Sequence, residues 1–286
     1  MGADWGAIGE IALTPQRRVR RVGFGGVRLT GPGTYGPPPD LDAARRVVRL
    51  AAAAGIQLFD TADCYGPHVS ETLIAEALHP YPEDVVVSTK GGRLALGDER
   101  WRADGRPEHL RSACEGSLRR LRLDAIDLYQ LNAVDPAVPI EESLGALVDL
   151  RDAGSIRAIG VCNVTAGDLD RACAVAPIAS VQNRYDIRTR DADPVLELCA
   201  RRGIAFLPWF PVPNGMTAAP GSALERVSTV HGATPAQVAI AWLVRRAPVT
   251  VPLPGTSDPD WLAEDLGALE LRLDDDEVAA LTAMAG

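Results

Sequence analysis

Three side chains of this 286-residue chain have the types and spacing of an acid–base site. Asp60 and Tyr65 lie in the segment FDTADCYG, and Lys90 lies in STKGG, each at the end of a run that predicts a strand. A lysine at one strand end beside an aspartate at the next would form a partly buried ion pair. A tyrosine near that ammonium group would have its pKa lowered, because the positive charge favours the phenolate. Such a phenol could exchange a proton near neutral pH, and an ordinary ion pair of the core with a tyrosine nearby is the alternative.

The three side chains belong to a repeating order of secondary-structure elements. Short runs of β-branched or aromatic residues predict strands, and stretches with the apolar spacing of helices separate them. The predicted strands span residues 20–26, 57–61, 84–90, 126–132, 157–163, 179–184, 204–209 and 249–253. Strict alternation implies parallel pairing. Eight units of about 36 residues are typical of a (β/α)8 TIM barrel, so we expect this α/β fold, with functional residues at the carboxyl ends of its strands.

An open, doubly wound sheet is the main alternative to the barrel. Its usual signature is G-x-G-x-x-G after the first strand, but Arg28 stands where the third glycine would be. Segments outside the repeat predict an N-terminal hairpin at the bottom of the barrel, a short extra helix within 220–232 and a C-terminal amphipathic helix in LDDDEVAALTAMAG. No low-complexity linker interrupts the chain, so we expect a single domain over residues 1–286.

The composition argues against several classes of function. With 29 Lys and Arg residues against 38 Asp and Glu residues, the net charge is −9, which disfavours general binding to nucleic acids or anionic membranes. Five scattered cysteines and four dispersed histidines form no disulfide or metal-ligand pattern, so we expect no metal and a reducing compartment. No apolar run approaches the roughly 18 residues of a membrane helix, and no signal-peptide pattern is present. The sequence predicts a cytoplasmic protein and does not indicate its oligomeric state.

Five segments of the chain together resemble the aldo-keto reductase family. They are FDTADCYG, STKGG, GVCN, VQNRYD and PGTSDPDWLAEDLGAL, in the order and spacing of the family. The resemblance implies an NADP-dependent oxidoreductase that reduces an aldehyde or ketone, as a small-molecule carbonyl substrate, to an alcohol. It implies that Tyr65 protonates the carbonyl oxygen while the nicotinamide delivers hydride to the carbon. Lys90 would tune Tyr65, and Asp60 would hold Lys90.

The resemblance also implies a site for the cofactor. Asn163 and Gln182 match positions that hydrogen-bond the nicotinamide carboxamide. Trp209 stands where the family stacks an aromatic ring on the nicotinamide, and simple core packing is the alternative for this residue. The residues that would hold the adenosine end are Gly255, Thr256, Ser257, Glu264 and Asp265.

The adenosine end departs from the family pattern in two ways. Asp265 occupies a position that is usually Asn, and no Lys or Arg lies between Gly255 and Asp265 to pair with the 2′-phosphate of NADP. Asp258 adds a further negative charge to this segment. The habit of the family predicts NADP as the cofactor, and these departures leave NAD as the alternative.

Asn132, within YQLNAVD, stands where the family usually has a catalytic histidine. An asparagine keeps an amide that donates a hydrogen bond, but it cannot change its charge near neutral pH. Two branches of the family carry Asn here: the β subunits of voltage-gated potassium channels and a bacterial group of pyridoxal reductases. The segments RLTGPGTYGPP, YGPHVSETLIAEAL and GATPAQVAIAWLVRRAP are similar to the second branch. This similarity predicts pyridoxal or a related aldehyde as the substrate.

The residues that contact the substrate are predicted from their position alone. His68 and Trp101 are candidates to line the pocket, as is His109, and an exposed loop position is the alternative for His68. Two other functions stay open. The chain could be a nicotinamide-binding sensor or partner protein with vestigial activity, which only Asn132 supports. It could also be a dehydratase or epimerase that recycles its cofactor on the same scaffold.

Overall fold

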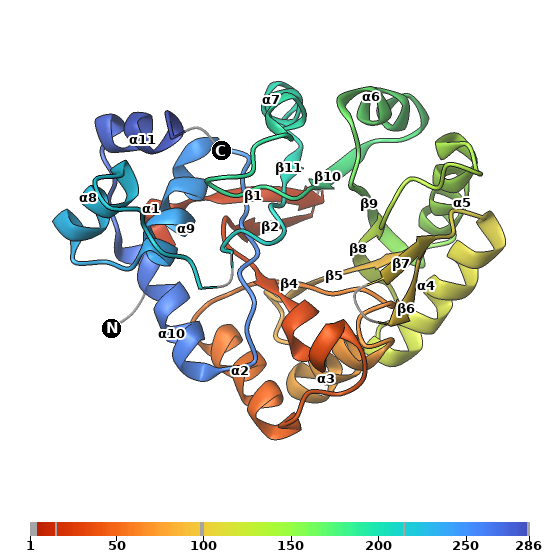
Figure 1. Ribbon diagram of the computed structural model, residues 1–286. Coiled ribbons are helices and arrows are strands. Elements are labelled where there is room, and N and C mark those ends of the chain that lie inside the picture. Colours follow the sequence, from red (N-terminus) through yellow and green to blue (C-terminus); the bar gives the residue numbers. More distant parts are fainter. Residues whose placement is uncertain (1–4, 15, 98–99, 214, 285–286) are drawn as a thin grey trace.

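The computed structural model describes residues 5–14, 16–97, 100–213 and 215–284. Within them, seven parallel strands form one curled sheet in which neighbouring strands follow each other along the chain (Figure 1). In sheet order the strands are β3 (Phe24–Gly25), β4 (Leu58–Asp60), β5 (Val86–Gly91), β8 (Ile126–Leu131), β9 (Ile156–Cys162), β10 (Ile178–Gln182) and β11 (Ala205–Phe206). They coincide with seven of the eight predicted strands, and the predicted (β/α)8 barrel is confirmed.

The eighth predicted strand, residues 249–253, joins the two edges of the sheet without forming a regular strand. On one side it exchanges two backbone hydrogen bonds of 2.8 Å with Phe206 of β11. On the other side, Gly25 N of β3 donates to Pro254 O at 2.8 Å. Pro252 and Pro254 have no N–H to give to a ladder, so the segment closes the barrel with isolated contacts instead of a continuous strand.

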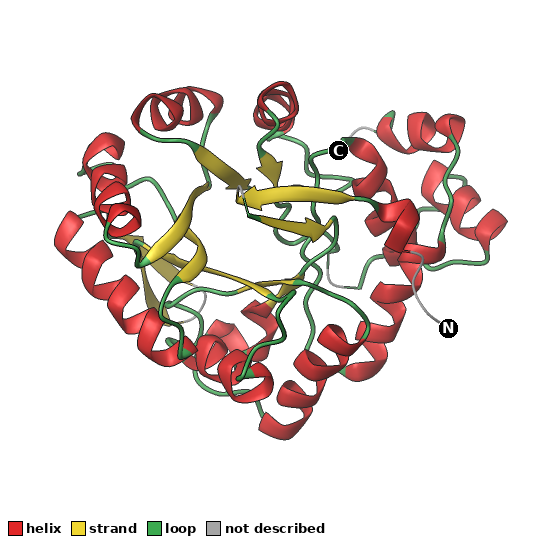
Figure 2. Ribbon diagram, turned by 180° about the vertical axis from the view of Figure 1, so that it is seen from behind, coloured by secondary structure: helices red, strands yellow, loops and turns green. Residues whose placement is uncertain are grey.

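In the described part of the chain, a helix follows each of the eight strand positions, and these helices surround the sheet (Figures 1 and 2). They are α2 (Leu41–Ala53), α3 (Val69–Leu78), α4 (Pro107–Leu121), α5 (Ile140–Asp152), α6 (Ala166–Val175), α7 (Asp193–Arg202), α9 (Pro235–Arg246) and α10 (Pro259–Gly267). Capping boxes at Thr165 and Thr234 open α6 and α9. Because the helices cover the outer face, every residue of β5 and β8 is buried. None of the described helices is both long and apolar enough to cross a membrane.

The segments outside the repeat form the elements that were predicted. Near the N-terminus, after the short α1 (Trp5–Ile8), β1 (Glu10–Thr14) and β2 (Arg17–Arg20) pair as an antiparallel hairpin. The hairpin buries apolar side chains and packs through β1 against β8, β9, β10 and β11. The extra helix is α8 (Ala223–His231), and the C-terminal helix is α11 (Asp275–Thr282).

A second hairpin was not predicted. After β5, the chain forms an antiparallel pair of β6 (Arg93–Gly97) and β7 (Arg100–Ala103) before α4 begins. The segments RLALG and RWRA contain no β-branched residue, so they lack the composition that predicts strands. The hairpin leaves the carboxyl end of β5, and it therefore adds side chains to the mouth of the barrel where the site is expected.

Candidate active site

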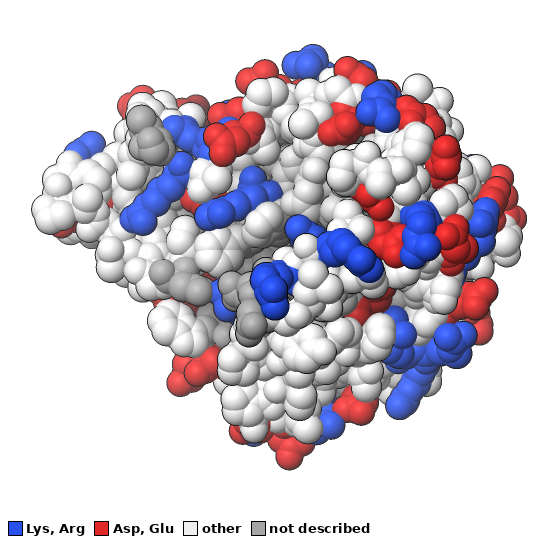
Figure 3. Space-filling model, turned by 45° about the vertical axis from the view of Figure 1, so that its right-hand side comes forward, with Lys and Arg blue, Asp and Glu red and all other residues white. Residues whose placement is uncertain are grey.

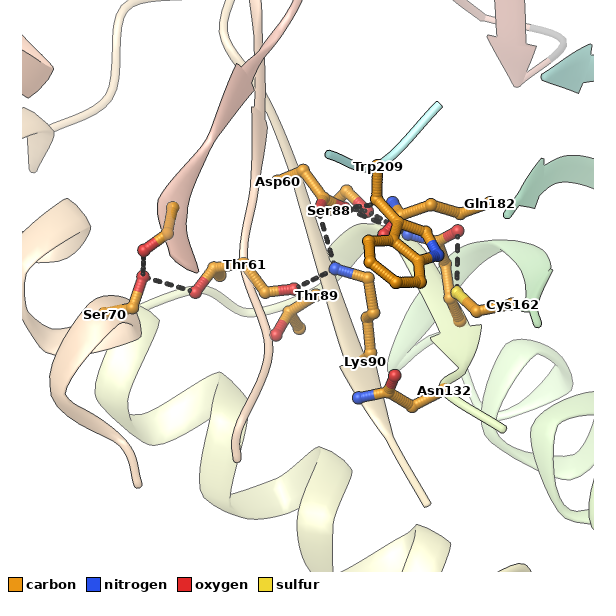
Figure 4. Close-up of polar contacts among 12 residues, drawn as sticks. Asp60, Thr61, Ser70, Ser88, Thr89, Lys90, Asn132, Cys162, Gln182 and Trp209 are labelled. Atoms are coloured by element: carbon orange, nitrogen blue, oxygen red, sulfur yellow. Dashed lines mark hydrogen bonds and ion pairs between the residues drawn. The ribbon is translucent and has the colours of Figure 1, made fainter. Parts of the chain in front are cut away.

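A buried ion pair joins the carboxyl ends of β4 and β5. Lys90 Nζ lies 2.6 Å from Asp60 Oδ2, and the two side chains are 1% and 4% exposed (Figure 4). Lys90 Nζ also donates a hydrogen bond to Thr61 O at 2.7 Å. Burial alone would lower the pKa of Lys90, but the neighbouring negative charges, that of Asp60 first among them, outweigh it and raise the pKa overall. Lys90 therefore carries its positive charge throughout the physiological pH range.

The carboxylate of Asp60 is held from its other side by three neutral donors. Ser88 Oγ, Gln182 Nε2 and Gln130 Nε2 donate to Asp60 Oδ1 at 2.9, 3.0 and 3.1 Å. These donors come from β5, β10 and β8, so they reach Asp60 across the inside of the barrel. A buried carboxylate is costly unless it is paired and hydrogen-bonded. This network satisfies that requirement and fixes the position of Asp60 against Lys90.

Tyr65 follows β4 and faces the ammonium group of Lys90. Lys90 Nζ lies 5.2 Å from the centroid of the Tyr65 ring, and Trp101 of β7 packs edge-on against the same ring, with 6.4 Å between centroids. The prediction of a lowered pKa is wrong for this environment. Burial raises the pKa of Tyr65 to about 12, and the opposing effect of Lys90 is smaller. The phenol keeps its proton at neutral pH, as a proton donor must.

Asn132, Asn163 and Trp209 are linked at the mouth of the barrel. Asn163 Nδ2 donates to the backbone oxygen of Asn132 at 2.8 Å, and Trp209 Nε1 donates to Asn163 Oδ1 at 3.1 Å. Asn163 has a φ of +57°, a left-handed conformation that asparagine tolerates better than most residues. The side-chain amide of Asn132 contacts Cys64 Sγ at 3.4 Å, and sulfur is a weak acceptor. The Asn132 amide is therefore positioned and still able to donate to a ligand.

A cavity of about 1080 Å³ lies over these side chains. It exceeds the roughly 300–1,000 Å³ of common ligand pockets, so it has room for a dinucleotide and a second small molecule. Figure 3 shows a hollow in the molecular surface with blue arginine side chains around it. The predicted site residues that line the cavity are Asp60, Tyr65, Trp101, Asn132, Asn163, Gln182, Trp209, Gly255, Thr256, Ser257, Glu264 and Asp265.

The remaining predicted residues do not line this cavity. Lys90 is almost wholly buried and can act on a ligand only through Tyr65. His68 is exposed at the start of α3, and His109 lies on α4 beside Asp104. The placement of His68 is that of an exposed loop residue, and the geometry gives no support to its predicted contact with the substrate.

Glycine is needed where the segment that closes the barrel passes β3. A Cβ atom added at Gly255 would lie 2.0 Å from Gly25 O, and one added at Gly25 would lie 2.8 Å from Leu253 O. Any side chain here would push loop 255–257 away from β3 and into the cavity. Gly25, Gly26 and Gly255 therefore form a part of the cavity lining that has no side chains, where the extended phosphate-bearing part of a dinucleotide could lie.

Charged side chains are unevenly distributed along the cavity. Glu264 and Asp265 of α10 make one part negative, and burial together with the charge of Glu264 raises the pKa of Asp265 to about 7. Arg28, Arg93 and Arg184 also line the cavity, and none of them was predicted as a site residue. Two of them stand in or beside motifs that were already singled out, since Arg184 lies within VQNRYD and Arg93 follows STKGG. Their position beside those motifs was the available signal.

A second group of polar side chains is buried between β5 and the helices α3 and α4. Glu71 accepts hydrogen bonds from Thr89 Oγ1 at 2.7 Å and from Arg120 Nε at 2.6 Å. Near them, Asp63 is 5% exposed, and its Oδ1 has no hydrogen-bond partner among the described residues. Burial, and then the charge of Glu71, raise the pKa of Asp63 to about 8.

We expect Asp63→Asn to change how stability depends on pH. The pKa of Asp63 is raised in the folded state, so the folded protein loses stability as pH rises from about 4, where the unfolded chain ionises, to about 8. Asparagine has no such titration. The free energy of unfolding of the variant, relative to that of the wild type, should therefore increase by about 1.4 kcal/mol for each pH unit within this window. Urea unfolding at several pH values measures the difference, with Asp124→Asn at an exposed position as the control. A pH-independent difference would mean that Asp63 is already ionised in the folded protein.

Both the sequence and the fold match known proteins. The model of the Aldo/keto reductase family matches residues 21–285. The chain is 39% identical over 271 residues to the pyridoxine 4-dehydrogenase of Escherichia coli, which covers 93% of this chain and 94% of that protein. It is 39% identical over 263 residues to an uncharacterised oxidoreductase of Schizosaccharomyces pombe, covering 92% and 86%. A thermostable aldo-keto reductase solved with the inhibitor epalrestat superposes with a TM-score of 0.84 at 27% identity, covering 96% of this chain and 99% of that one.

Proposed function

Because the chain belongs to the aldo/keto reductase family, we propose that it reduces an aldehyde or ketone to an alcohol with a nicotinamide cofactor, and that Tyr65 supplies the proton. One observation carries this proposal. The same cavity reaches Tyr65 and Asn132 and also the loop of residues 255–257, where Gly255 closely approaches β3. A dinucleotide along this loop and a carbonyl compound over Tyr65 would share one cavity.

Each polar group beneath the cavity has a proposed part in the reaction. When bound, the reduced nicotinamide supplies a hydride to the carbonyl carbon. Tyr65 donates its phenolic proton to the carbonyl oxygen, and the Asn132 amide donates a hydrogen bond to that oxygen without titrating. Lys90 faces the phenolate that remains and stabilises it by its positive charge. Asp60 acts through Lys90 as a positioning residue.

The nicotinamide ring is proposed to lie against Trp209. The indole N–H of Trp209 is held by Asn163, which fixes the plane of a flat aromatic wall. Gln182 uses its Nε2 on Asp60, so its Oε1 is the group that could accept a hydrogen bond from the carboxamide. The residues proposed to hold the adenosine end are Gly255, Thr256, Ser257, Glu264 and Asp265.

Pyridoxal, or a related small aldehyde, is the proposed substrate. The support is the 39% identity to a pyridoxine 4-dehydrogenase over nearly the full length of both chains. The polar site at Tyr65 and Asn132 is suited to a carbonyl group, and the wall formed by Trp101 is suited to an aromatic ring.

The proposal is tested by following the absorbance of NADPH and of NADH separately in the presence of pyridoxal and a panel of simple aldehydes. We expect oxidation of at least one cofactor, dependent on both the aldehyde and the enzyme. Tight cofactor binding without any oxidation would contradict the proposal. It would favour a sensor or partner protein, or a dehydratase or epimerase that recycles its cofactor, for which Asn132 in place of a titrating group is the supporting observation.

NADPH is the proposed cofactor, because it is the usual cofactor of the family, and NADH is the alternative. A specific observation favours the alternative. Glu264 and Asp265 line the cavity on α10, and no Lys or Arg lies between Gly255 and Asp265 to neutralise a 2′-phosphate. Trp261, which is 56% exposed and also lines the cavity, offers a ring for the adenine of either cofactor.

We expect Asp265→Asn to shift binding towards NADPH. Removing a negative charge near the 2′-phosphate should lower the Kd for NADPH relative to that for NADH by about fivefold at about pH 8.5. At about pH 6 the effect should be small, because the pKa of Asp265 is about 7 and the wild-type carboxyl is then mostly neutral. Titration of tryptophan fluorescence measures both constants. Asp260→Asn, on the exposed side of the same helix, is the matched control. An unchanged ratio at both pH values would show that Asp265 does not face the 2′-phosphate.

A further inference from the structure

We infer that Arg93 forms an anion-binding subsite beside Tyr65, so that the preferred substrate is a carbonyl compound that also carries a carboxylate or phosphate group. The inference rests on the proposed reductase function and deepens it by naming the class of substrate. It begins from the hairpin of β6 and β7, which the sequence did not predict and which brings two further side chains to the cavity.

Arg93 and Trp101 share one face of this hairpin. Arg93 pairs with Ala103, two residues from Trp101, so Arg93 and Trp101 are diagonal neighbours across the two strands. The guanidinium carbon of Arg93 lies 5.6 Å from the centroid of Trp101, and the Trp101 ring meets Tyr65 edge-on. Both Arg93 and Trp101 line the cavity. One aromatic ring therefore separates the guanidinium group from the proposed proton donor.

Arg93 is a half-buried cation whose charge no carboxylate balances within residues 5–14, 16–97, 100–213 and 215–284. Its contact with Trp101 orients the guanidinium plane, and its N–H groups have no hydrogen-bond partner among the described residues. A partly desolvated charge without a counterion attracts an anion into the same space. Arginine presents N–H donors in a planar fork that fits carboxylate and phosphate oxygens in a bidentate manner.

The position of Arg93 in the barrel separates it from the proposed cofactor residues. Asn163, Gln182 and Trp209 follow β9, β10 and β11, whereas Arg93 follows β5, between the strands that lead to Tyr65 and Asn132. The mouth of the barrel is thus divided into a cofactor half and a substrate half. Arg93 belongs to the substrate half.

The positive charge of Arg93 also acts on Cys64, which lies in the substrate half of the barrel mouth. Burial, and then the charge of Asp63, raise the pKa of the Cys64 thiol, and the charges of Lys90 and Arg93 act in the opposite direction. Cys64 contacts the amide of Asn132. A molecule that places its carbonyl oxygen at Tyr65 and Asn132 can therefore place an anionic group at Arg93.

The test compares matched substrates that differ only in charge. The first pair is 4-carboxybenzaldehyde and its neutral methyl ester, and the second is pyridoxal 5′-phosphate and pyridoxal, so that the carboxylate and the phosphate are tested separately. For the wild type we expect kcat/KM to favour the anionic member of at least one pair. In Arg93→Gln this preference should fall by about tenfold to a hundredfold, mainly through KM, as expected when a charge-assisted contact is lost. Arg93→Lys should restore part of it.

Arg102→Gln is the matched control. Arg102 lies on the opposite face of the same hairpin, is exposed and does not line the cavity, and its substitution removes the same charge. It should leave the ratio of anionic to neutral substrate unchanged. If the preference for the anionic substrate falls equally in Arg93→Gln and Arg102→Gln, it depends on the overall charge of the protein and not on a subsite at Arg93. That result would overturn the inference. An unchanged ratio in Arg93→Gln would do the same.

Failure of the subsite and failure of the proposed reductase give different results. If no aldehyde is reduced by any of these proteins, the proposed function fails, and binding alone still tests Arg93. The quenching of tryptophan fluorescence by benzoate and by benzamide is then compared with cofactor present. Tighter binding of benzoate that is lost in Arg93→Gln supports the subsite, and equal binding of the two compounds overturns it.

Discussion

Replacing Tyr65 by phenylalanine is expected to lower kcat for carbonyl reduction by about a hundredfold to ten-thousandfold, which is the usual contribution of a general acid. The affinity for the nicotinamide cofactor should not change. The substitution removes only the phenolic O–H, so the ring keeps its contacts with Lys90 and Trp101. Absorbance of the reduced nicotinamide measures turnover, and fluorescence titration measures cofactor binding in the same preparation.

Tyr35→Phe provides the matched control for this experiment. Tyr35 is 51% exposed on the loop before α2 and does not line the cavity, so the same atom is removed outside the site. That variant should retain wild-type turnover. If Tyr65→Phe instead turns over at the wild-type rate, another group must donate the proton. Asn132 cannot take its place, because an amide does not titrate in this range.

The barrel and most of the cavity lining could be predicted because they follow from regular features. Alternating strands and helices lead to parallel pairing, and parallel pairing places all strand ends on one face. Asp60, Asn132 and Gln182 lie far apart in the chain, yet they meet beneath one cavity for this reason. Motifs at strand ends were therefore sufficient to predict most of the residues that line this cavity.

Two features of the backbone were missed by the same reasoning. Residues 249–253 are rich in valine and were predicted as a strand, but Pro252 and Pro254 prevent a continuous ladder with both neighbours. The hairpin of β6 and β7 arises from cross-strand pairing rather than from strand-like composition. Arg93 was overlooked for the same reason, since its position in the cavity depends on that pairing.

The direction of the Tyr65 pKa shift shows a different limit of prediction from sequence. Sequence spacing identified the charged neighbour Lys90 and hence an effect that lowers the pKa. The ion pair of Lys90 with Asp60 was predicted too, but the sequence could not show how much water the fold removes from the phenol. Burial is the larger effect and raises the pKa to about 12. A pKa shift therefore requires the three-dimensional environment even where the partner can be recognised from the sequence.

Lys90→Met should reduce turnover as severely as Tyr65→Phe, by about a hundredfold or more, but for another reason. After proton transfer, Tyr65 is a phenolate in a site where burial already disfavours its charge. Lys90 is the cation that faces this ring, and methionine keeps most of the length of the side chain without the charge. The substitution also leaves Asp60 buried and unpaired, which should lower the free energy of unfolding by about 3–5 kcal/mol. Loss of activity in this variant alone would therefore not distinguish the loss of phenolate stabilisation from the loss of folded protein.

The double variant Asp60→Asn/Lys90→Met separates the two effects. It removes both charges of the buried pair, while the amide oxygen of the introduced asparagine can still accept hydrogen bonds from Ser88 and Gln130. We expect urea unfolding to show that most of the lost stability returns, because no unpaired charge remains in the core. Turnover should stay low, because nothing then stabilises the phenolate of Tyr65. Recovery of both stability and turnover would make Lys90 a purely structural residue, and the proposed proton transfer would need another source of stabilisation.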